Sequence, residues 1–179
     1  IMQELGKTLT PSPILSTSVL GVSTVDMLGS DEQKSNFLPK IVSGEITTAL
    51  AIDEGNHHNP FDVETTANLE GDHWVLNGNK VFVIDGASAD IILIVARTSG
   101  KARESNGISV FAANKDAKGF NISKISTADS RNYANLEISD LKLEQSTLLG
   151  EQDLAGETIE KILDLGRIAI SAEMLGNTE

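Results

Sequence analysis

Apolar residues recur at spacings of three and four over the first third of the chain, which predicts amphipathic helices there. Ser30 can cap a second helix, because Gln33 follows three residues later as in a capping box. Gly29 ends the first helix, and Pro11 and Pro13 lie at its start. The apolar stripe of that first helix consists of Ile14, Leu15, Val19, Val22, Val25 and Leu28.

From about residue 46 the hydrophobic period changes to two, which is typical of strands. The segment ADIILIVART is almost wholly apolar, so we expect a strand that is buried on both faces. Gly71-Asp72 and Asn77-Gly78 predict turns, and Asn-Gly is the strongest short hairpin signal. Strands that recur at such short intervals predict a compact antiparallel sandwich or barrel. The other segments with this pattern are ITTALAID, VETTANLEGDHWVLNGNKVFV, GISVFAAN and NLEISDLKLE.

The helical period returns at Gly156, and the predicted helix is apolar around much of its circumference. Such a helix requires burial in a bundle, so we expect the chain to be a piece of a longer protein. Arg167 is costly in such a helix unless it is paired, and Asp164 is the expected partner, with an anion as the alternative. The fold class is therefore α+β.

Composition narrows the function classes. The 179 residues carry a formal net charge of -12, which disfavours nucleic acid as a partner. The sequence contains no run of about 18 apolar residues, so we expect no membrane span. The first residues lack the pattern of a signal peptide. The absence of cysteine excludes disulfides, thiolate metal sites and Cys nucleophiles, and it fits a cytoplasmic protein.

The most polar candidate site is the loop DEGNHHNP. His57 and His58 lie there between acidic residues, which is one pattern of a metal site. Adjacent His side chains point in different directions, however, so a polar surface loop is the favoured interpretation. The sequence contains no nucleophile elbow, Walker loop or Rossmann fingerprint.

Three segments, in order, resemble the acyl-CoA dehydrogenase family of flavoproteins. They are GSDEQKSNFLPKIVSGEITTALAIDE, TTANLEGDHWVLNGNKVFVIDGASADIILIVART and LLGEQDLAGETIEKILDLGRIAISAEMLG, which match the family's Leu-Pro-x-Ile-x-x-Gly, Leu-Asn-Gly-x-Lys and Gly-Arg patterns. The resemblance implies the end of an N-terminal helical domain over residues 1–45 and a middle β-barrel over 46–150. It implies the first helix of a C-terminal helical domain over 151–179.

The resemblance also implies an activity, the α,β-dehydrogenation of an acyl-CoA thioester with FAD as hydride acceptor, in a homo- or hetero-oligomer. It places Phe82 where a Trp covers the flavin ring and Ile84 where a Thr donates a hydrogen bond. Phe can stack on a ring, but an Ile side chain cannot donate. The backbone N–H groups of Val83 and Ile84 are therefore the expected donors.

The second flavin segment departs from the family's Thr-Glu-Pro and Gly-x-Gly-Ser-Asp pattern. Ala51, Ile52 and Asp53 are the expected flavin contacts, with Ile52 or Asp53 in place of the Thr. His58 replaces a Ser that contacts the thioester ligand, and Asn59 replaces an Asp. These changes favour the alternative of a non-catalytic homologue or a partner subunit of a heteromeric dehydrogenase.

The resemblance assigns no catalytic residue to this chain. The family's catalytic carboxylate lies beyond residue 179 in most members, and in some it precedes the Arg of the Gly-Arg pair. Gly166 occupies that second position here. We therefore expect the base beyond this chain or in a partner subunit.

Overall fold

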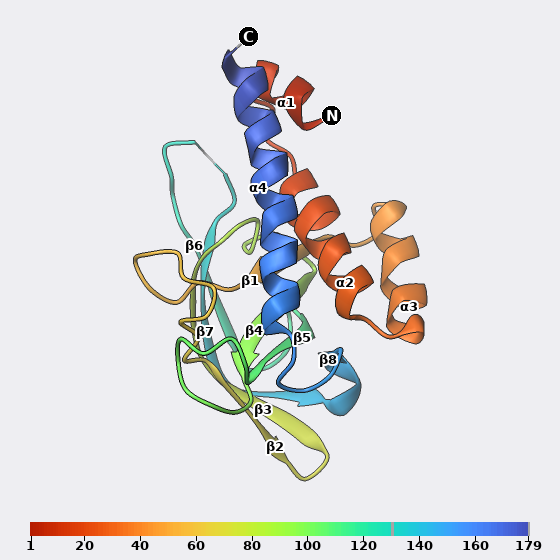
Figure 1. Cartoon of the computed structure of the whole chain (residues 1–179), viewed down its shortest axis with the longest axis vertical. Coiled ribbons are helices and arrows are strands. Elements are labelled where there is room, and N and C mark those ends of the chain that lie inside the picture. The colour runs from red at the N-terminus through yellow and green to blue at the C-terminus, as the bar shows by residue number, and fades with distance from the viewer. Residues whose placement is uncertain (130, 179) are drawn as a thin grey trace.

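The computed structural model describes residues 1–129 and 131–178. It is an α+β structure with helices at both ends of the chain and one sheet between them (Figure 1). No helix in the described ranges has the length and apolarity that crossing a bilayer requires. The helices are α1 (Met2–Thr8), a π-helical segment η1 (Ile14–Gly21), α2 (Val22–Leu28), α3 (Asp31–Val42) and α4 (Gly156–Thr178).

The predicted capping box of α3 is confirmed. The Ser30 hydroxyl accepts the Gln33 N–H at 3.2 Å, and the Gln33 side-chain oxygen accepts the Ser30 N–H at 2.9 Å. The Gln33 amide group also donates to the carbonyl oxygens of Ser146 and Leu148. One side chain therefore starts the helix and ties it to the sheet edge.

The first predicted helix forms, and its buried face coincides only in part with the expected stripe, since Val25 is fully buried and Val22 and Leu28 are partly buried. Its first half, η1, has π-helical turns, which rotate the following residues relative to an α-helix. Leu15 and Leu20 are buried, and so are the polar residues Ser16 and Thr17, whereas Val19 is only partly buried.

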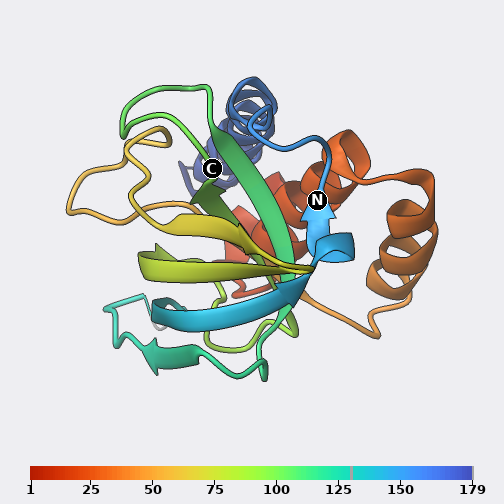
Figure 2. The same cartoon turned by 90° about the horizontal axis from the view of Figure 1, so that it is seen from below.

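The sheet has eight strands in the order β6-β7-β3-β2-β4-β5-β8, with β1 also paired to β4. Figure 2 shows that it is strongly curved and that the helices gather on one side of it. The sheet is not closed, because β6 and β8 end the order. The strands are β1 (Thr48–Ala51), β2 (Thr66–Glu70), β3 (His73–Val83), β4 (Ile91–Arg97), β5 (Ile108–Asn114), β6 (Phe120–Lys124), β7 (Ala134–Glu144) and β8 (Leu148–Leu149), with a 3₁₀ turn η2 (Gln145–Thr147) before β8.

The sheet is antiparallel as predicted, except for two pairings of β4. β1 runs parallel to β4 over Thr48–Ala51, and β2 pairs with it in parallel only at Thr66. Both strands thus lie along one edge of β4, one after the other. The chain between them, residues 52–65, leaves the sheet and returns to the same edge.

Two hydrophobic clusters hold the fold together. One lies within the curl of the sheet, where Trp74 packs edge-on against Phe111 at a ring distance of 5.2 Å. The other lies between the sheet and the helices, where Ile159 and Ile162 of α4 pack with Leu93 of β4. β4 contributes to both clusters, as its apolar sequence predicts.

The predicted turn at Gly71-Asp72 is confirmed, but the one at Asn77-Gly78 is wrong, because β3 continues through it. The Asn77 side chain accepts the Asp140 N–H at 2.8 Å and donates to the Asp140 carboxylate at 3.2 Å. Asp140, with φ of 48°, is the additional residue of a bulge in β7. Glycine is needed at position 78 because a Cβ would lie 2.4 Å from the Thr65 hydroxyl oxygen.

Candidate functional site

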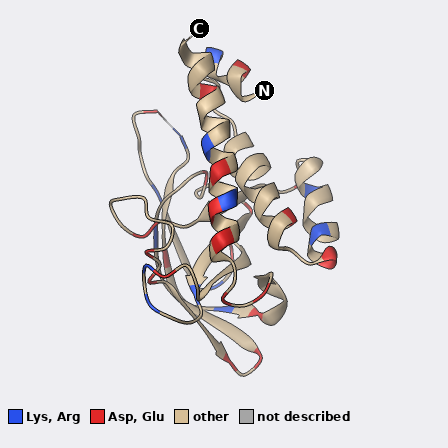
Figure 3. Cartoon of the chain, viewed as in Figure 1, with Lys and Arg blue, Asp and Glu red and all other residues tan. Residues whose placement is uncertain are grey.

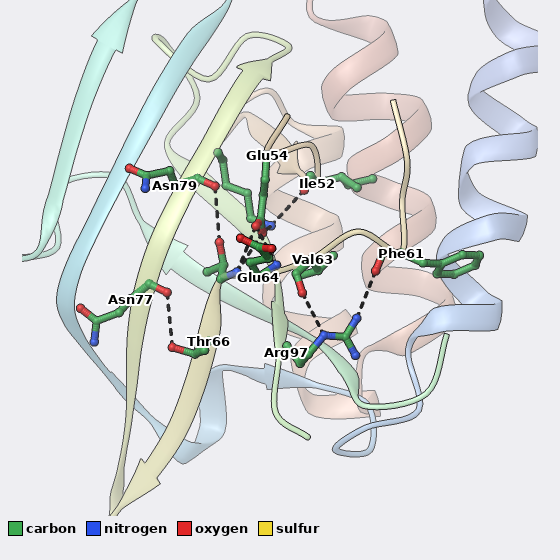
Figure 4. A network of polar contacts seen from close by, with 11 residues as sticks. Ile52, Glu54, Phe61, Val63, Glu64, Thr66, Asn77, Asn79 and Arg97 are labelled. Atoms are coloured by element: carbon green, nitrogen blue, oxygen red, sulfur yellow. Dashed lines mark hydrogen bonds and ion pairs between the residues drawn. The ribbon is translucent and has the colours of Figure 1, made fainter. Parts of the chain in front are cut away.

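The loop of residues 52–65 is anchored to β3 by a buried ion pair. The Lys80 ammonium lies 2.6 Å from a Glu54 carboxylate oxygen and donates to the Ile52 carbonyl oxygen at 2.9 Å. The same carboxylate accepts the N–H groups of Glu64 and Thr65 at 2.7 and 3.1 Å. Glu54 therefore closes the loop across its base (Figure 4).

The sequence carried a signal for this burial. Residues 74, 76, 78 and 80 of β3 share one face, because side chains alternate along a strand. Trp74 and Leu76 on that face are buried, and Lys80 is fully buried with them. Burial lowers the pKa of Lys80, and the Glu54 charge opposes that shift.

A second anchor holds the same loop to β4. Arg97 is buried, and its guanidinium donates to the carbonyl oxygens of Phe61 and Val63 on one side (Figure 4). On the other side it donates to those of Ser99, Glu104 and Asn106. Its fork of donors thus joins two loops that leave the sheet on either side of β4.

The end of β3 contains a second bulge. Between Lys80 and Val83 this strand has one residue more than β7, and Phe82 adopts φ of 51°. The Phe82 N–H donates to the Asn135 side-chain oxygen at 3.2 Å. Phe82 is 58% exposed, and its ring lies edge-on to that of Tyr133, with 6.1 Å between centroids.

An apolar cavity of about 280 Å³ lies between the loop, the bulge, η1 and α4. Its ionisable lining residues in the described chain are Asp53, His58 and Arg167. The remaining lining residues are Leu15, Leu20, Leu50, Ile52, Val81, Phe82, Val83, Ile84, Leu163, Gly166 and Ile170. A second cavity of about 350 Å³ shares Leu15, Ile84 and Ile170 with the first and extends toward Tyr133.

Most of the residues expected to contact flavin or substrate converge on this cavity. Ile52, Asp53 and His58 line it from the loop, and Phe82, Val83 and Ile84 line it from the bulge. Ala51 does not, because it is fully buried in the sheet cluster, opposite Ile94 in the register. The sequence did not identify Leu15 and Leu20 of η1 as part of the wall, because their role depends on the packing of η1 against the sheet.

Asp53 and His58 form a pair within the cavity wall. The His58 Nδ1 atom lies 2.9 and 3.0 Å from the two carboxylate oxygens of Asp53. His58 is about half exposed, and the Asp53 side chain is 29% exposed. No group of three or more His, Cys, Asp or Glu residues in residues 1–129 and 131–178 is arranged to hold a metal ion.

The predicted partner of Arg167 is confirmed. Its Nη1 atom lies 2.6 Å from the Asp164 carboxylate and 3.2 Å from that of Glu160. Figure 3 shows acidic and basic positions alternating along the middle of α4. These bonds raise the pKa of Arg167, which is half exposed and stays charged where it meets the cavity. Gly166 lies against Leu20, since a Cβ there would be 3.0 Å from the Leu20 side chain.

This geometry defines an α+β protein with an apolar cavity between a bulged strand and a helix. The chain matches the family model described as "Acyl-CoA dehydrogenase, middle domain" over residues 50–146. It matches "Acyl-CoA dehydrogenase, N-terminal domain" over residues 1–45. The chain therefore belongs to the acyl-CoA dehydrogenase family.

Curated and solved relatives agree with this assignment. The short-chain specific acyl-CoA dehydrogenase of Clostridium acetobutylicum is 33% identical over 99% of this chain and 48% of its own length. The butyryl-CoA dehydrogenase structure from Megasphaera elsdenii superposes with a TM-score of 0.88 at 28% identity, covering 98% of this chain and 47% of that one. The structure of a glutaryl-CoA dehydrogenase from Mycobacterium smegmatis in complex with FADH2 superposes with a TM-score of 0.77 at 25% identity. The match covers 87% of this chain and 40% of that one. The chain thus spans about half the length of these relatives.

Proposed function

We propose that this chain belongs to an FAD-dependent dehydrogenase that removes hydrogen from the α and β carbons of an acyl-CoA thioester. The observation that carries the proposal is the cavity at which the 52–58 loop, the Phe82 bulge and the Gly166-Arg167 turn of α4 meet. These are three segments that lie far apart in the sequence, and the resemblance places flavin or substrate contacts on the first two. The enclosure is largely apolar, which suits a flat ring and an aliphatic chain.

The bulge fits one face of an isoalloxazine ring. An exposed Phe82 at the rim can stack on a ring, and Val81, Val83 and Ile84 add apolar surface. The Val81 N–H donates to the Asp53 carbonyl oxygen at 2.8 Å, and the Phe82 N–H donates to Asn135. Val83 pairs with Ala134 in the β3–β7 register, so of the two expected donors, Val83 and Ile84, we propose the Ile84 N–H as the donor to the ring edge. The chemistry that FAD supplies when bound is the acceptance of a hydride.

The opposite wall of the cavity suits the acyl part of the substrate. Leu20, Leu163 and Ile170 line it with aliphatic side chains. His58 provides a polar group for the thioester end. This chain would thus orient the substrate and exclude water, while the base that removes the α proton comes from elsewhere in the protein.

A non-catalytic homologue is the second candidate, and one observation favours it. Asp53 is the one carboxylate among the cavity-lining residues of the described chain, and His58 already engages it. Neither Ile52 nor Ile84 can donate from its side chain. A protein with this cavity could bind a flavin or an acyl-CoA without turning it over.

Two measurements on the purified full-length protein distinguish these candidates. The visible absorption spectrum, before and after incubation with FAD and gel filtration, shows whether flavin is bound. Anaerobic addition of an acyl-CoA then tests whether the flavin is reduced. Bound flavin that bleaches supports the dehydrogenase, bound flavin that does not bleach supports the non-catalytic homologue, and failure to bind FAD contradicts the proposal.

We further propose that the protein works as a homo- or hetero-oligomer. Large apolar residues of α4 are exposed between charged ones such as Asp164 and Arg167, and exposed apolar surface of this kind calls for a cover. Light scattering of the full-length protein tests this, and a monomer at micromolar concentration would contradict it. The exposed apolar residues of α4 are Leu165, Ile168, Ile170, Met174 and Leu175.

A further inference from the structure

We propose that Ser16 and Asp85 are positioning residues for the flavin site, because their hydrogen bond holds the turn that presents the Ile84 N–H to the ring edge. The inference rests on the proposed function, since it explains what fixes the donor that this function requires. Neither residue of the pair lines the flavin cavity itself. Their effect on a ligand is therefore exerted through the backbone of the turn.

The Ile84 N–H is available to a ligand. Ile84 follows the last residue of β3, and in residues 1–129 and 131–178 its N–H has no hydrogen-bond acceptor. The peptide group that links Val83 to Ile84 is planar and trans, so its N–H points away from its carbonyl oxygen. That oxygen accepts the Gly86 N–H at 3.1 Å, which leaves the Ile84 N–H on the outer side of the turn. Val83 and Ile84 both line the cavity.

The turn that carries this donor has little support from the sheet. Residues 84–90 lie between β3 and β4 and belong to no strand of the described chain. Asp85 is the third residue of the turn and adopts φ of 57°, which is unfavourable for most residues other than glycine. Such a conformation persists where the surrounding structure holds it in place. A contact from outside the turn is therefore needed.

Ser16 of η1 provides this contact. Its hydroxyl lies 2.6 Å from an Asp85 carboxylate oxygen, and Ser16 is fully buried. A carboxylate only accepts, so the hydroxyl donates to it in a charge-assisted bond. Ser16 follows Leu15, and Asp85 follows Ile84, and both of these apolar neighbours line the cavity. The bond therefore joins the η1 wall of the cavity to the turn that carries the donor.

Other contacts near Asp85 do not replace this bond. The far end of the same loop is held separately, because the Asp90 carboxylate accepts the N–H and the hydroxyl of Thr47 at 2.9 Å each. Arg131 lines a second, smaller cavity together with Asp85, but its guanidinium is paired with Glu173. The position of the turn relative to η1 thus depends on Ser16.

Two variants remove the bond from either side, and two others serve as controls. Ser16→Ala removes the hydroxyl, and Asp85→Gly removes the carboxylate but suits the positive φ. Asp85→Asn removes the charge and keeps a bond, since the amide can donate to the Ser16 hydroxyl, which can then donate to the Pro13 carbonyl oxygen at 3.1 Å. Thr17→Val removes the neighbouring hydroxyl of η1, which bonds to the backbone of Thr48 in β1 and not to the turn.

Fluorescence titration of the full-length proteins with FAD is the main measurement. We expect Ser16→Ala and Asp85→Gly to bind FAD roughly two- to tenfold more weakly, which is the range for one neutral hydrogen bond. The double variant should lose no more than either single variant, because both remove the same interaction. Asp85→Asn and Thr17→Val should bind FAD as the wild type does, although Thr17→Val lowers the midpoint of urea unfolding.

The visible spectrum of the bound flavin provides a second readout, which a loss of stability alone would not change. It should differ from the wild type in Ser16→Ala and Asp85→Gly and not in Thr17→Val. If the wild type binds FAD, and Ser16→Ala binds it equally tightly with an unchanged spectrum, the inference is overturned and the proposed function stands. An equal weakening by Thr17→Val also overturns the inference, because the bond would then act only through the stability of η1. If the wild type binds no FAD, both are overturned.

Discussion

The ammonium of Lys80 lies 2.6 Å from the carboxylate of Glu54, and the lysine side chain is fully buried. This pair joins the end of β3 to both ends of the 52–65 loop, because Glu54 also accepts the N–H groups of Glu64 and Thr65. Asp53 follows Ile52, whose carbonyl oxygen accepts from Lys80. The ion pair therefore determines where one wall of the cavity lies.

Replacing Glu54 with Gln should destabilise the protein strongly. The substitution keeps the size of the side chain but leaves the Lys80 charge buried without a counter-charge, which typically costs about 3–5 kcal/mol. The free energy of unfolding from urea denaturation measures the loss. Glu64→Gln removes a negative charge from an exposed neighbour and should change stability little. An equal effect of the two substitutions would show that the pair contributes nothing specific.

The cost of Glu54→Gln should also shrink as pH rises. The pKa of Lys80 is lowered from its ordinary value of 10.5, chiefly by burial, while Glu54 opposes the shift. Between the lowered folded pKa and the unfolded value, the unfolded chain binds more protons, so stability rises with pH. Without Glu54 the pKa of Lys80 in the folded protein falls further, so this window begins at lower pH. The variant therefore regains more stability than the wild type as pH rises. Unfolding at pH about 7 and about 9.5 tests this, and a constant difference would contradict it.

Arg97→Lys should loosen the loops on both sides of β4. The guanidinium donates to five carbonyl oxygens that a single ammonium cannot reach together. We expect a loss of at least about 1.5–3 kcal/mol, since buried carbonyl groups lose charge-assisted partners. Hydrogen exchange should increase over residues 59–65 and 99–106. Arg103→Lys, at an exposed guanidinium paired with Asp62, should leave exchange over 99–106 near the wild-type rate.

Hydrophobic periodicity predicted the elements whose environment is uniform along their length. β4 is buried on both faces, β7 alternates, and α3 begins at its capping box, each as expected. The Asn77-Gly78 turn was wrong because a contact 63 residues away overrides the local preference for a turn. A local sequence pattern covers only a few neighbouring residues, so it cannot include a partner as distant as Asp140.

The candidate site likewise combines features that the sequence predicts with features that depend on distant contacts. The resemblance identified the segments of residues 51–58 and 82–84, but not how they meet. The pairing of Asp53 with His58 depends on an irregular loop, and the shape of that loop depends on Lys80 and Arg97 far along the chain. The alternation of side chains along β3 could have predicted the burial of Lys80. No periodic pattern, however, predicts that the side chains of Asp53 and His58 lie side by side.

The crossing of α1 and α4 depends on two glycines. A Cβ at Gly6 would lie 2.0 Å from the Glu173 carbonyl oxygen, and one at Gly176 would lie 1.9 Å from that of Gln3 (Figure 1). Alanine normally stabilises a helix relative to glycine by about 0.5–1 kcal/mol. Here we expect a loss of about 1–3 kcal/mol, because the helices must move apart.

Urea denaturation and hydrogen exchange over residues 2–8 measure the effect of Gly6→Ala and Gly176→Ala. Gly55→Ala is the control, since a Cβ at Gly55 would meet no atom within 4 Å. Stabilisation by Gly6→Ala would show that the helices do not cross as closely as the structure has them.

Phe82→Ala should weaken flavin binding with little effect on the fold. Phe82 is 58% exposed and its ring contacts that of Tyr133, so its removal opens no cavity in the core. A stacked aromatic pair contributes about 0.5–1.5 kcal/mol, which corresponds to a roughly two- to tenfold weaker affinity for FAD. Phe82→Trp keeps an aromatic face and should retain the affinity, although both residues must adopt the positive φ of the bulge.

Flavin fluorescence titration of the three proteins measures the affinities, with unfolding curves to establish equal stability. Equal affinity in Phe82→Ala would place the flavin away from the bulge, because no other aromatic side chain in the described chain lines this cavity.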